Sequence, residues 1–385
     1  MPARDPNQGL ELLGGLSAAQ FLRDYWQQKP LLVRGSVSDF ANPIEPDDLA
    51  GLACDPEASA RLISGDTEHT DWSVEYGPFE EDRFASLPDR AWTLLVSDVE
   101  RFWPEGREFL AQFDFVPRWR RDDLMISYAA PEGSVGPHVD AYDVFLFQAS
   151  GRRRWQIQSP PGPLDCHDDL PLAILREFEP TESWVLEPGD LLYLPPNLPH
   201  YGLSLDDQCM TWSIGFRAPT HLDLLTGFLE ERANRVGETA RYADPQRPVT
   251  AYPGELPLHD RTQLRGILRE MLAADDTELD AFLGRFLSRP AGNIELHPTN
   301  PDSVPGACHI HPGIRRHWLA TPQGPVLCAA GHHYPAYGLS PEALEELCGT
   351  ETFDPHQWQP VWPAVYEMLR DGLEEGWLEP AGDPD

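Results

Sequence analysis

The stretch GPHVDAYDVFLFQASGRRRWQI, residues 136–157, holds a His-x-Asp pair, a hydrophobic run and three consecutive arginines. A Ser-Gly pair at 150–151 separates the hydrophobic run from the arginines, and such a pair between apolar segments is typical of a two-residue hairpin turn. In the hairpin that this turn predicts, Gln148 faces Arg153 across the two strands. The stretch therefore predicts two neighbouring antiparallel strands, with a histidine and an aspartate near the start of the first.

Only the middle arginine of the three is expected to point inwards. Alternate residues of a strand face opposite sides, so Arg153 shares a face with Trp155 and Ile157. Arg152 and Arg154 lie on the other face, which is uniformly polar and therefore solvated. A buried arginine needs an anionic partner to offset its lost hydration. Because the hairpin supplies no acid, we expect Arg153 to bind the carboxylate of a ligand.

His-x-Asp is a weak motif by itself, and it occurs three times in this chain. The pairs are His138/Asp140, His167/Asp169 and His221/Asp223. The last pair begins an amphipathic helix, where side chains two apart diverge, so Asp223 is interpreted as a charge at the helix start. The middle pair lies in a loop rich in proline and acid, which favours a solvated loop. His138 and Asp140 lead into a hydrophobic strand, where side chains two apart point the same way.

A metal needs a third ligand, and His200 is the candidate. It lies in EPGDLLYLPPNLPHYG, residues 187–202, in which a Pro-Gly-Asp turn leads into a short strand and prolines then constrain the histidine. Two histidines and one carboxylate leave open positions on iron, which oxygen activation requires. On a flat strand Asp140 and Gln148 would lie ~26 Å apart at ~3.3 Å per residue, so we expect that strand to coil or bulge.

The pattern of apolar residues along the chain distinguishes three regions. Residues 1–217 combine short helices with many closely spaced β-branched or aromatic runs, which predict a β-barrel or sandwich. Residues 218–290 carry apolar residues at helical spacing, and a partner subunit is one surface that would bury them. Residues 291–305 resemble a linker, and 306–385 predict a small α+β unit of winged-helix size.

The last region also concentrates cysteine and histidine. These residues are Cys308, His309, His311, His317, Cys328, His332, His333 and Cys348. A zinc site is one interpretation, although no C-x-x-C pair occurs among them. The other interpretation is a hairpin with histidine and aromatic residues on its surface, and both stay open.

Composition limits the classes of function. The 385 residues include 63 acidic and 29 basic side chains, for a formal net charge of −34 at pH 7. Such a surface repels phosphates and disfavours direct binding of nucleic acid, whereas it attracts basic proteins. No stretch approaches ~18 consecutive apolar residues, and the N-terminus lacks the pattern of a secretion signal. With six scattered cysteines, these features predict a cytoplasmic protein without a membrane segment.

Three segments together resemble the JmjC-type, cupin-fold oxygenases that depend on 2-oxoglutarate. They are DDLMISYAAPEGSVGPHVDAYDVFLFQASGRRRWQI (122–157), EPGDLLYLPPNLPHYG (187–202) and WSIGFRAP (212–219). The resemblance is greatest to the bacterial ribosomal oxygenases that hydroxylate an arginine of large-subunit ribosomal protein L-sixteen. It implies an α+β protein with a double-stranded β-helix (cupin, jelly-roll) JmjC core in 1–217, a helical dimerisation region in 218–290 and a winged-helix-like domain in 291–385.

The resemblance also implies functional residues and partners. His138, Asp140 and His200 would hold Fe(II), and Arg153 would bind the distal carboxylate of 2-oxoglutarate. The cleft for the substrate arginine would be formed by Asp123, Met125, Tyr142 and Ser213. The implied reaction uses dioxygen, decarboxylates 2-oxoglutarate to succinate and hydroxylates the arginine at Cβ. The enzyme would be a homodimer, and the acidic surface would steer its basic ribosomal substrate.

Two other functions stay open at the level of sequence. A histidyl hydroxylase of another ribosomal protein would share the iron and cosubstrate residues, so the core motifs do not separate it from an arginyl enzyme. A non-enzymatic regulator, with a cupin sensor joined to a DNA-binding winged helix, would need a basic recognition helix. The helical segments 340–349 and 363–380 are acidic, which counts against the regulator.

Overall fold

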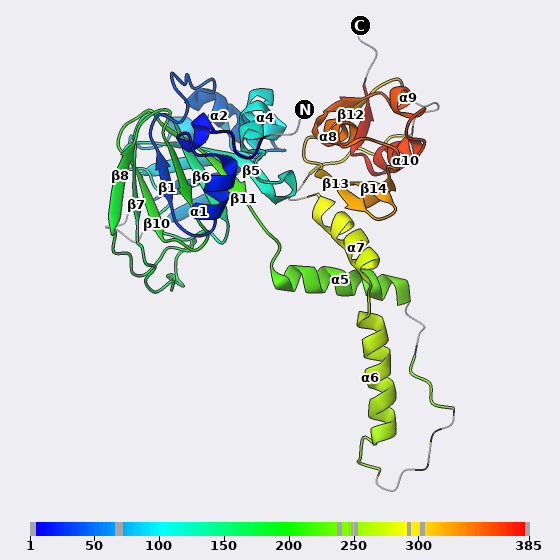
Figure 1. The fold of residues 1–385 in the computed structure, drawn as a ribbon. Helices are drawn as coiled ribbons and strands as arrows, with labels where there is room; N and C mark the ends of the chain where they lie inside the picture. Colours follow the sequence, from blue (N-terminus) through cyan, green and yellow to red (C-terminus); the bar gives the residue numbers. More distant parts are fainter. Residues whose placement is uncertain are drawn as a thin grey trace. The chain divides into compact units, whose positions relative to one another are not determined.

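The structure, a computed structural model, divides into two compact units, residues 1–218 and 219–385 (Figure 1). It describes residues 5–65, 72–236, 241–245, 247, 249, 253–290, 294–300 and 305–381. Within those ranges we find no helix of the length and apolarity needed to cross a membrane.

Two antiparallel sheets form the core of the first unit. The larger has eight strands in the order β1-β9-β6-β11-β5-β4-β2-β3, and the smaller has the order β10-β7-β8. The strands of the larger sheet are β1 (Leu31–Val33), β2 (Ser59–Ser64), β3 (Ser73–Tyr76), β4 (Trp92–Ser97), β5 (Arg121–Ala129), β6 (Asp143–Ser150), β9 (Leu191–Leu194) and β11 (Cys209–Phe216). Those of the smaller sheet are β7 (Arg153–Ile157), β8 (Glu182–Leu186) and β10 (His200–Ser204). This is the two-sheet architecture of a jelly roll.

The central strands of the larger sheet separate two hydrophobic layers. Phe145 and Phe147 of β6 pack in one cluster, to which the helices contribute, whereas Val144 and Leu146 pack with Trp155 of the smaller sheet. Because both faces of β6 are buried, its sequence is a continuous hydrophobic run without polar alternation.

Short helices cover the outer face of the larger sheet. They are α1 (Ala18–Asp24), α2 (Pro46–Ala53), α3 (Glu81–Ala85) and α4 (Pro104–Leu110), with single 3-10 turns at Glu11–Leu13, Val99–Arg101, Ala111–Phe113 and Arg118–Arg120. Phe21 of α1, Leu49 of α2 and Phe109 of α4 belong to the same buried cluster as the outer residues of β6. The opposite face of the sheet is thereby left for the smaller sheet and the cavity between the two.

The predicted hairpin at 150–151 is wrong. β6 pairs with β9 and β11 of the larger sheet, while β7 pairs with β8 and β10 of the smaller one. The chain crosses between the sheets at Gly151, whose φ is +59° and where an added Cβ would lie 2.5 Å from the backbone nitrogen of Cys209. Both edges of β6 are already occupied, so the turn directs the chain into the other layer.

The facing of the arginines does not depend on that hairpin. Arg153 is only 4% exposed, whereas Arg152 and Arg154 are exposed, as alternation within β7 alone predicts. A single long strand from Asp140 is not formed, because β6 begins only at Asp143, but the expected bulge is present, since the register between β6 and β11 shifts between Met210 and Thr211. Residues 138–142 precede the strand, and Arg153 enters from the other sheet.

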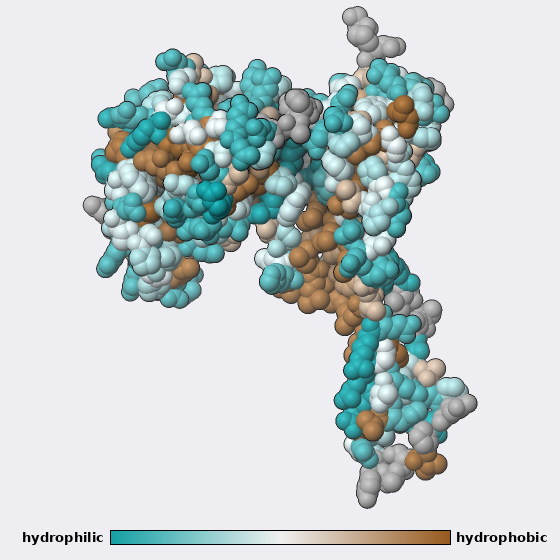
Figure 2. Space-filling view, viewed as in Figure 1, coloured by the Kyte–Doolittle hydropathy of each residue, from teal (hydrophilic) through white to brown (hydrophobic). Residues whose placement is uncertain are grey.

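The second unit begins with three helices, α5 (His221–Val236), α6 (Leu258–Leu272) and α7 (Asp276–Ser288). Figure 2 shows apolar side chains gathered over α5 and α7. Large apolar residues are exposed on all three helices: Leu222, Leu225 and Leu229 on α5, Leu258, Leu264, Ile267, Leu268 and Leu272 on α6, and Leu279 on α7. The described part of the chain therefore leaves helical stripes without a covering partner.

The rest of the second unit is a small α+β assembly. It contains the sheets β16-β12-β17 and β13-β14-β15, with helices that share a separate hydrophobic cluster. The elements are β12 (Cys308–Ile310), β13 (Arg316–Thr321), β14 (Gly324–Ala329), β15 (His332–Pro335), α8 (Pro341–Gly349), β16 (Thr352–Phe353), α9 (Pro355–Trp358), α10 (Val365–Glu375) and β17 (Leu378–Pro380). Residues 291–293 and 301–304 of the predicted linker lie outside the described residues, and the division at 290 stays a prediction.

Candidate active site

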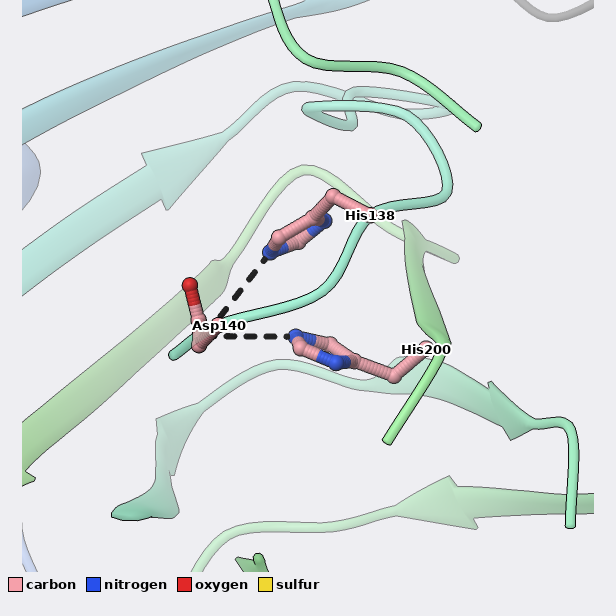
Figure 3. Close-up of side chains that lie close together, drawn as sticks. All are labelled: His138, Asp140 and His200. Carbon is pink, nitrogen blue, oxygen red and sulfur yellow. Dashed lines mark ion pairs between the residues drawn. The ribbon is translucent and has the colours of Figure 1, made fainter. Parts of the chain in front are cut away.

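Three side chains of the first unit converge on one another (Figure 3): His138, Asp140 and His200. The Nε2 atoms of His138 and His200 lie 4.0 Å and 3.6 Å from Oδ2 of Asp140. An isolated β-bridge joins the two histidines, with backbone N–H···O distances of 3.0 Å and 2.9 Å. The extended segment before β6 and the start of β10 thus bring together residues that are 60 positions apart in the sequence.

Backbone carbonyls fix both imidazole rings. Nδ1 of His138 lies 2.9 Å from the carbonyl oxygen of Gly136, and Nδ1 of His200 lies 2.9 Å from that of Leu198. Because a carbonyl only accepts, each Nδ1 carries the proton, and each Nε2 presents a lone pair towards Asp140. Burial and the neighbouring His138 lower the pKa of His200 to about 4. Both features keep a neutral imidazole available for a metal ion.

The donor set fits a divalent iron ion. The nitrogen–oxygen separations exceed hydrogen-bonding distance, so the three groups do not satisfy one another, yet they lie close enough to share one ion. Two imidazoles and one carboxylate on a single face are the ligands of non-haem Fe(II) oxygenases, in which the remaining positions take cosubstrate and oxygen.

Arg153 is a buried cation without an acid. Its guanidinium donates to Oγ of Ser127 and Oγ1 of Thr211, both at 3.3 Å, and lies over the ring of Trp155, while its Nε has no hydrogen-bond partner. Within the described ranges no carboxylate forms a salt bridge with it. Burial lowers its pKa. A charge desolvated in this way is stabilised only when an anion binds beside it, so the site fits a ligand carboxylate.

One cavity of about 330 Å³ is lined by Arg153 and by His138, Asp140 and His200. The four predicted substrate residues, Asp123, Met125, Tyr142 and Ser213, line the same cavity. Alternation explains the arrangement: Leu124 and Ile126 of β5 are fully buried against the helices, so residues 123, 125 and 127 face the cavity. The structure therefore brings every predicted site residue of the first unit to one cavity; their roles stay predictions.

The outer end of the cavity is rich in acid. Burial, Asp122 and Asp98 raise the pKa of Asp123 to about 7, and its Oδ2 accepts a hydrogen bond from the backbone of Asp98 at 3.3 Å. Burial likewise raises the pKa of Glu100, to about 8, although its Oε2 accepts from the backbone N–H of Leu124 at 2.9 Å. Burial and Asp140 raise the pKa of Tyr142.

Sequence reasoning missed two residues of this end. Arg217 lines the cavity and pairs with Asp122, and Glu100 lies behind Asp123. Arg217 stands inside the segment WSIGFRAP, one residue past a strand whose alternate residues face the cavity, so alternation would have pointed to it. Glu100 follows a left-handed Asp98 in a 3-10 turn, and no pattern in the sequence marks that position.

The other candidate metal sites are not supported. Thr220 and Asp223 exchange hydrogen bonds of 2.8 Å and 3.0 Å at the start of α5, which agrees with the interpretation of Asp223 as a helix-start charge. Nδ1 of His167 lies 3.9 Å from Oδ1 of Asp169, and no third ligand joins them among the residues that the structure describes. Among the described residues, no group of three metal ligands includes a member of the Cys/His-rich segment 308–348, which disfavours a zinc site there.

Two facing antiparallel sheets that enclose a His-x-Asp pair, a distant histidine and a buried arginine define a JmjC-type oxygenase of the cupin fold. Comparison with known proteins agrees with this class. A family model of the JmjC domain matches residues 108–224.

The similarity extends over most of the chain. The ribosomal protein uL16 3-hydroxylase of Escherichia coli is 36% identical over 295 residues, which are 75% of this chain and 76% of that protein. An X-ray structure of E. coli YcfD superposes with a TM-score of 0.79 at 30% identity, covering 94% of this chain and 98% of that one. YcfD in complex with cobalt and 2-oxoglutarate gives a TM-score of 0.74 at 30% identity, covering 94% and 97%. The chain belongs to the JmjC-type ribosomal oxygenases, and the predicted cupin fold is confirmed.

Proposed function

We propose that this chain is an Fe(II)- and 2-oxoglutarate-dependent hydroxylase of an arginine residue in ribosomal protein uL16, acting at Cβ. The observation that carries the proposal is one cavity that is lined by the His138–Asp140–His200 group, by the buried cation Arg153 and by the partly buried acid Asp123. An E. coli relative acts on uL16, and the solved relative binds cobalt with 2-oxoglutarate.

Different side chains of the cavity have different roles in the proposed reaction. His138, Asp140 and His200 hold Fe(II), which, with bound 2-oxoglutarate and dioxygen, supplies the oxidising power to hydroxylate a C–H bond. Arg153, steadied by Ser127 and Thr211, binds the distal carboxylate and so fixes the orientation of the cosubstrate. Residues of both sheets line the cavity, and the bound ligands would displace the remaining water from the reacting centre.

An acid at the outer end favours arginine over histidine as the target. Asp123 faces the cavity, and an ionised carboxylate binds a guanidinium with paired, charge-assisted hydrogen bonds, whereas a neutral imidazole offers it a single donor. The negative surface of the chain, with its net charge of −34, attracts a basic ribosomal protein at long range. A ribosomal substrate would place the enzyme in the cytoplasm.

Mass spectrometry tests the reaction. Recombinant uL16 is incubated with the enzyme, Fe(II), 2-oxoglutarate and oxygen, and we expect one added oxygen on one arginine. His138→Ala is expected to abolish the product and to lower iron binding, because one of three ligands is lost. Unmodified uL16, or an oxygen that maps to a histidine, contradicts the proposal.

We further propose a homodimer built on the helices of the second unit. The exposed apolar residues of α6 recur at helical spacing, and water does not favour such a stripe without a partner. Leu264→Glu with Leu268→Glu is expected to convert a dimer into a monomer in light-scattering chromatography. Leu164→Glu, at another exposed leucine outside these helices, is the control and is expected to leave the dimer intact. A monomeric wild type contradicts the proposal.

A further inference from the structure

Arg217, at the end of one strand, contacts residues of the two strands on either side of it and lines the cavity. It directly follows β11, which lies between β5 and β6 in the larger sheet. Its Nε lies 2.5 Å from Oδ2 of Asp122 on β5, and its guanidinium carbon lies 4.9 Å from the ring centroid of Tyr142, just before β6. Both Arg217 and Tyr142 line the cavity.

The two adjacent acids of β5 have different surroundings because they point to opposite faces of the strand. Asp122 is held by Arg217 and does not line the cavity, whereas Asp123 lines it. Within the described ranges Asp123 has no salt bridge. At Gly215 an added Cβ would lie 3.6 Å from Oδ1 of Asp123 and 3.7 Å from Cε2 of Tyr142, so the absence of a side chain there leaves space between carboxylate and ring.

The Tyr142 ring connects this end of the cavity to the metal-binding group. Tyr142 is two residues from Asp140, and the side chains of the two interact. Asp123 and the Tyr142 ring flank the same space at Gly215, so a guanidinium bound to Asp123 would lie beside the ring. The position of the ring would therefore affect where the target carbon comes to lie.

We propose that Arg217 is a positioning residue that determines substrate specificity: anchored on Asp122, it holds the Tyr142 ring in place and leaves Asp123 as the acid that receives the substrate guanidinium. The inference rests on the proposed arginine substrate. Without Arg217, the Tyr142 ring would lose the cation that packs on it, and the space beside Asp123 would no longer be held open for the substrate guanidinium.

Steady-state kinetics with a uL16 peptide that carries the target arginine test the role. Arg217→Gln is expected to raise KM for the peptide about fivefold, the effect of a lost cation–π contact, and to leave KM for 2-oxoglutarate unchanged. The ratio of succinate formed to peptide hydroxylated should rise as well, because a badly held substrate lets decarboxylation run without hydroxylation. Arg217→Lys keeps the charge but not the planar group, and should fall between wild type and Arg217→Gln.

Matched variants separate a positioning role from loss of structure. Arg23→Gln removes an equally exposed arginine that pairs with Asp24 away from the cavity, and should match wild type in every parameter. Asp122→Asn should reproduce the effect of Arg217→Gln, and the double variant should be no worse than either, since both break one interaction.

Three outcomes overturn the inference: an unchanged or lower KM for the peptide in Arg217→Gln, an equal rise in KM for 2-oxoglutarate, or additive losses in the double variant. The activity of the wild-type enzyme on the peptide distinguishes these three outcomes from a failure of the proposed function. If wild-type enzyme hydroxylates no arginine of the peptide, the proposed function and the inference both fall; if it does, only the inference is at stake.

Discussion

The two ends of the cavity have opposite electrostatic imbalances. At the inner end Arg153 is buried among hydroxyl groups and a tryptophan, with no acid paired to it in the described part of the chain. At the outer end Asp123 lies among Asp98, Glu100 and Asp122, with Arg217 held by Asp122. Each end therefore lacks a charge that a ligand can bring.

This difference suits two ligands of opposite charge. A dicarboxylate such as 2-oxoglutarate completes the inner end, and a guanidinium completes the outer end, each with charge-assisted hydrogen bonds. His138, Asp140 and His200 line the same cavity, so under the proposed function the two ligands would meet at the iron that these residues hold. In the ligand-free protein Arg153 is desolvated without an anion, and the raised pKa values of Asp123 and Glu100 show that the outer end disfavours ionised carboxylates until a cation binds there.

Replacing the buried cation should produce the largest effect. Arg153→Met is expected to raise KM for 2-oxoglutarate about a hundredfold, since removing one partner of a buried charge pair costs about 2–5 kcal/mol. The same change should raise the free energy of unfolding of the ligand-free protein by about 1 kcal/mol, because a desolvated charge disappears. Enzyme kinetics and urea denaturation, with and without 2-oxoglutarate, measure both.

The exposed neighbour provides the control for that experiment. Arg152→Met removes an arginine of the same strand region that pairs with Asp206 at the surface, and both quantities should stay at wild-type values. Equal effects from the two variants would show that Arg153 has no special role, and would contradict the claim that the inner end needs an anionic ligand.

Removing the acid at the outer end should have a smaller effect. Asp123→Asn is expected to raise KM for a uL16 arginine peptide about tenfold, because one charge-assisted contact becomes neutral. KM for 2-oxoglutarate should not change. The cavity mouth stays open to solvent on one side, which is why the loss is smaller than at Arg153.

The pH dependence of KM for the peptide shows whether the ionised or the protonated form of Asp123 binds the substrate. Its pKa is raised to about 7 by burial and by the acids Asp122 and Asp98; Glu100, Tyr142 and Arg217 complete its charged or titratable surroundings. The guanidinium binds the ionised form, so KM for the peptide should fall as pH rises from about 6 to about 8. Asp123→Asn should show no such fall, and a wild-type KM that rises with pH contradicts the assignment.

The positions of His138, Asp140, His200 and Arg153 were predictable because local rules determine them. Alternation within β7 places Arg153 inwards whichever strands β7 pairs with. The His138, Asp140 and His200 set follows from spacing and from the prolines that precede His200. The strands with which β6 and β7 pair were not predictable from the turn. A glycine with positive φ, such as Gly151, is compatible with a crossing between sheets as well as with a hairpin.

The outer end was predictable only in part. Asp123, Met125 and Ser213 follow from alternation on β5 and β11 once the strands are known. The pairing of Arg217 with Asp122 depends on the register between those strands, which shifts near Phe216. Glu100 reaches its place through a tertiary contact of a 3-10 turn with β5, and no local pattern contains that information.

The smallest effect is expected at Glu100, the acid farthest from the proposed substrate. Its pKa is raised from 4.5 to about 8, mainly by burial, so the folded protein retains a proton that the unfolded chain has released. The free energy of unfolding of the wild type must then fall as pH rises between these two values.

Glu100→Gln cannot ionise and can still accept the hydrogen bond from Leu124. It should therefore be more stable than wild type by about 1 kcal/mol near pH 8 and equal to it near pH 5. Urea denaturation at both pH values measures the difference, with the exposed Glu105→Gln as control. A variant that is equally stable at high pH would mean that water or a cation relieves the excess negative charge, and the outer end would no longer need a guanidinium to balance it.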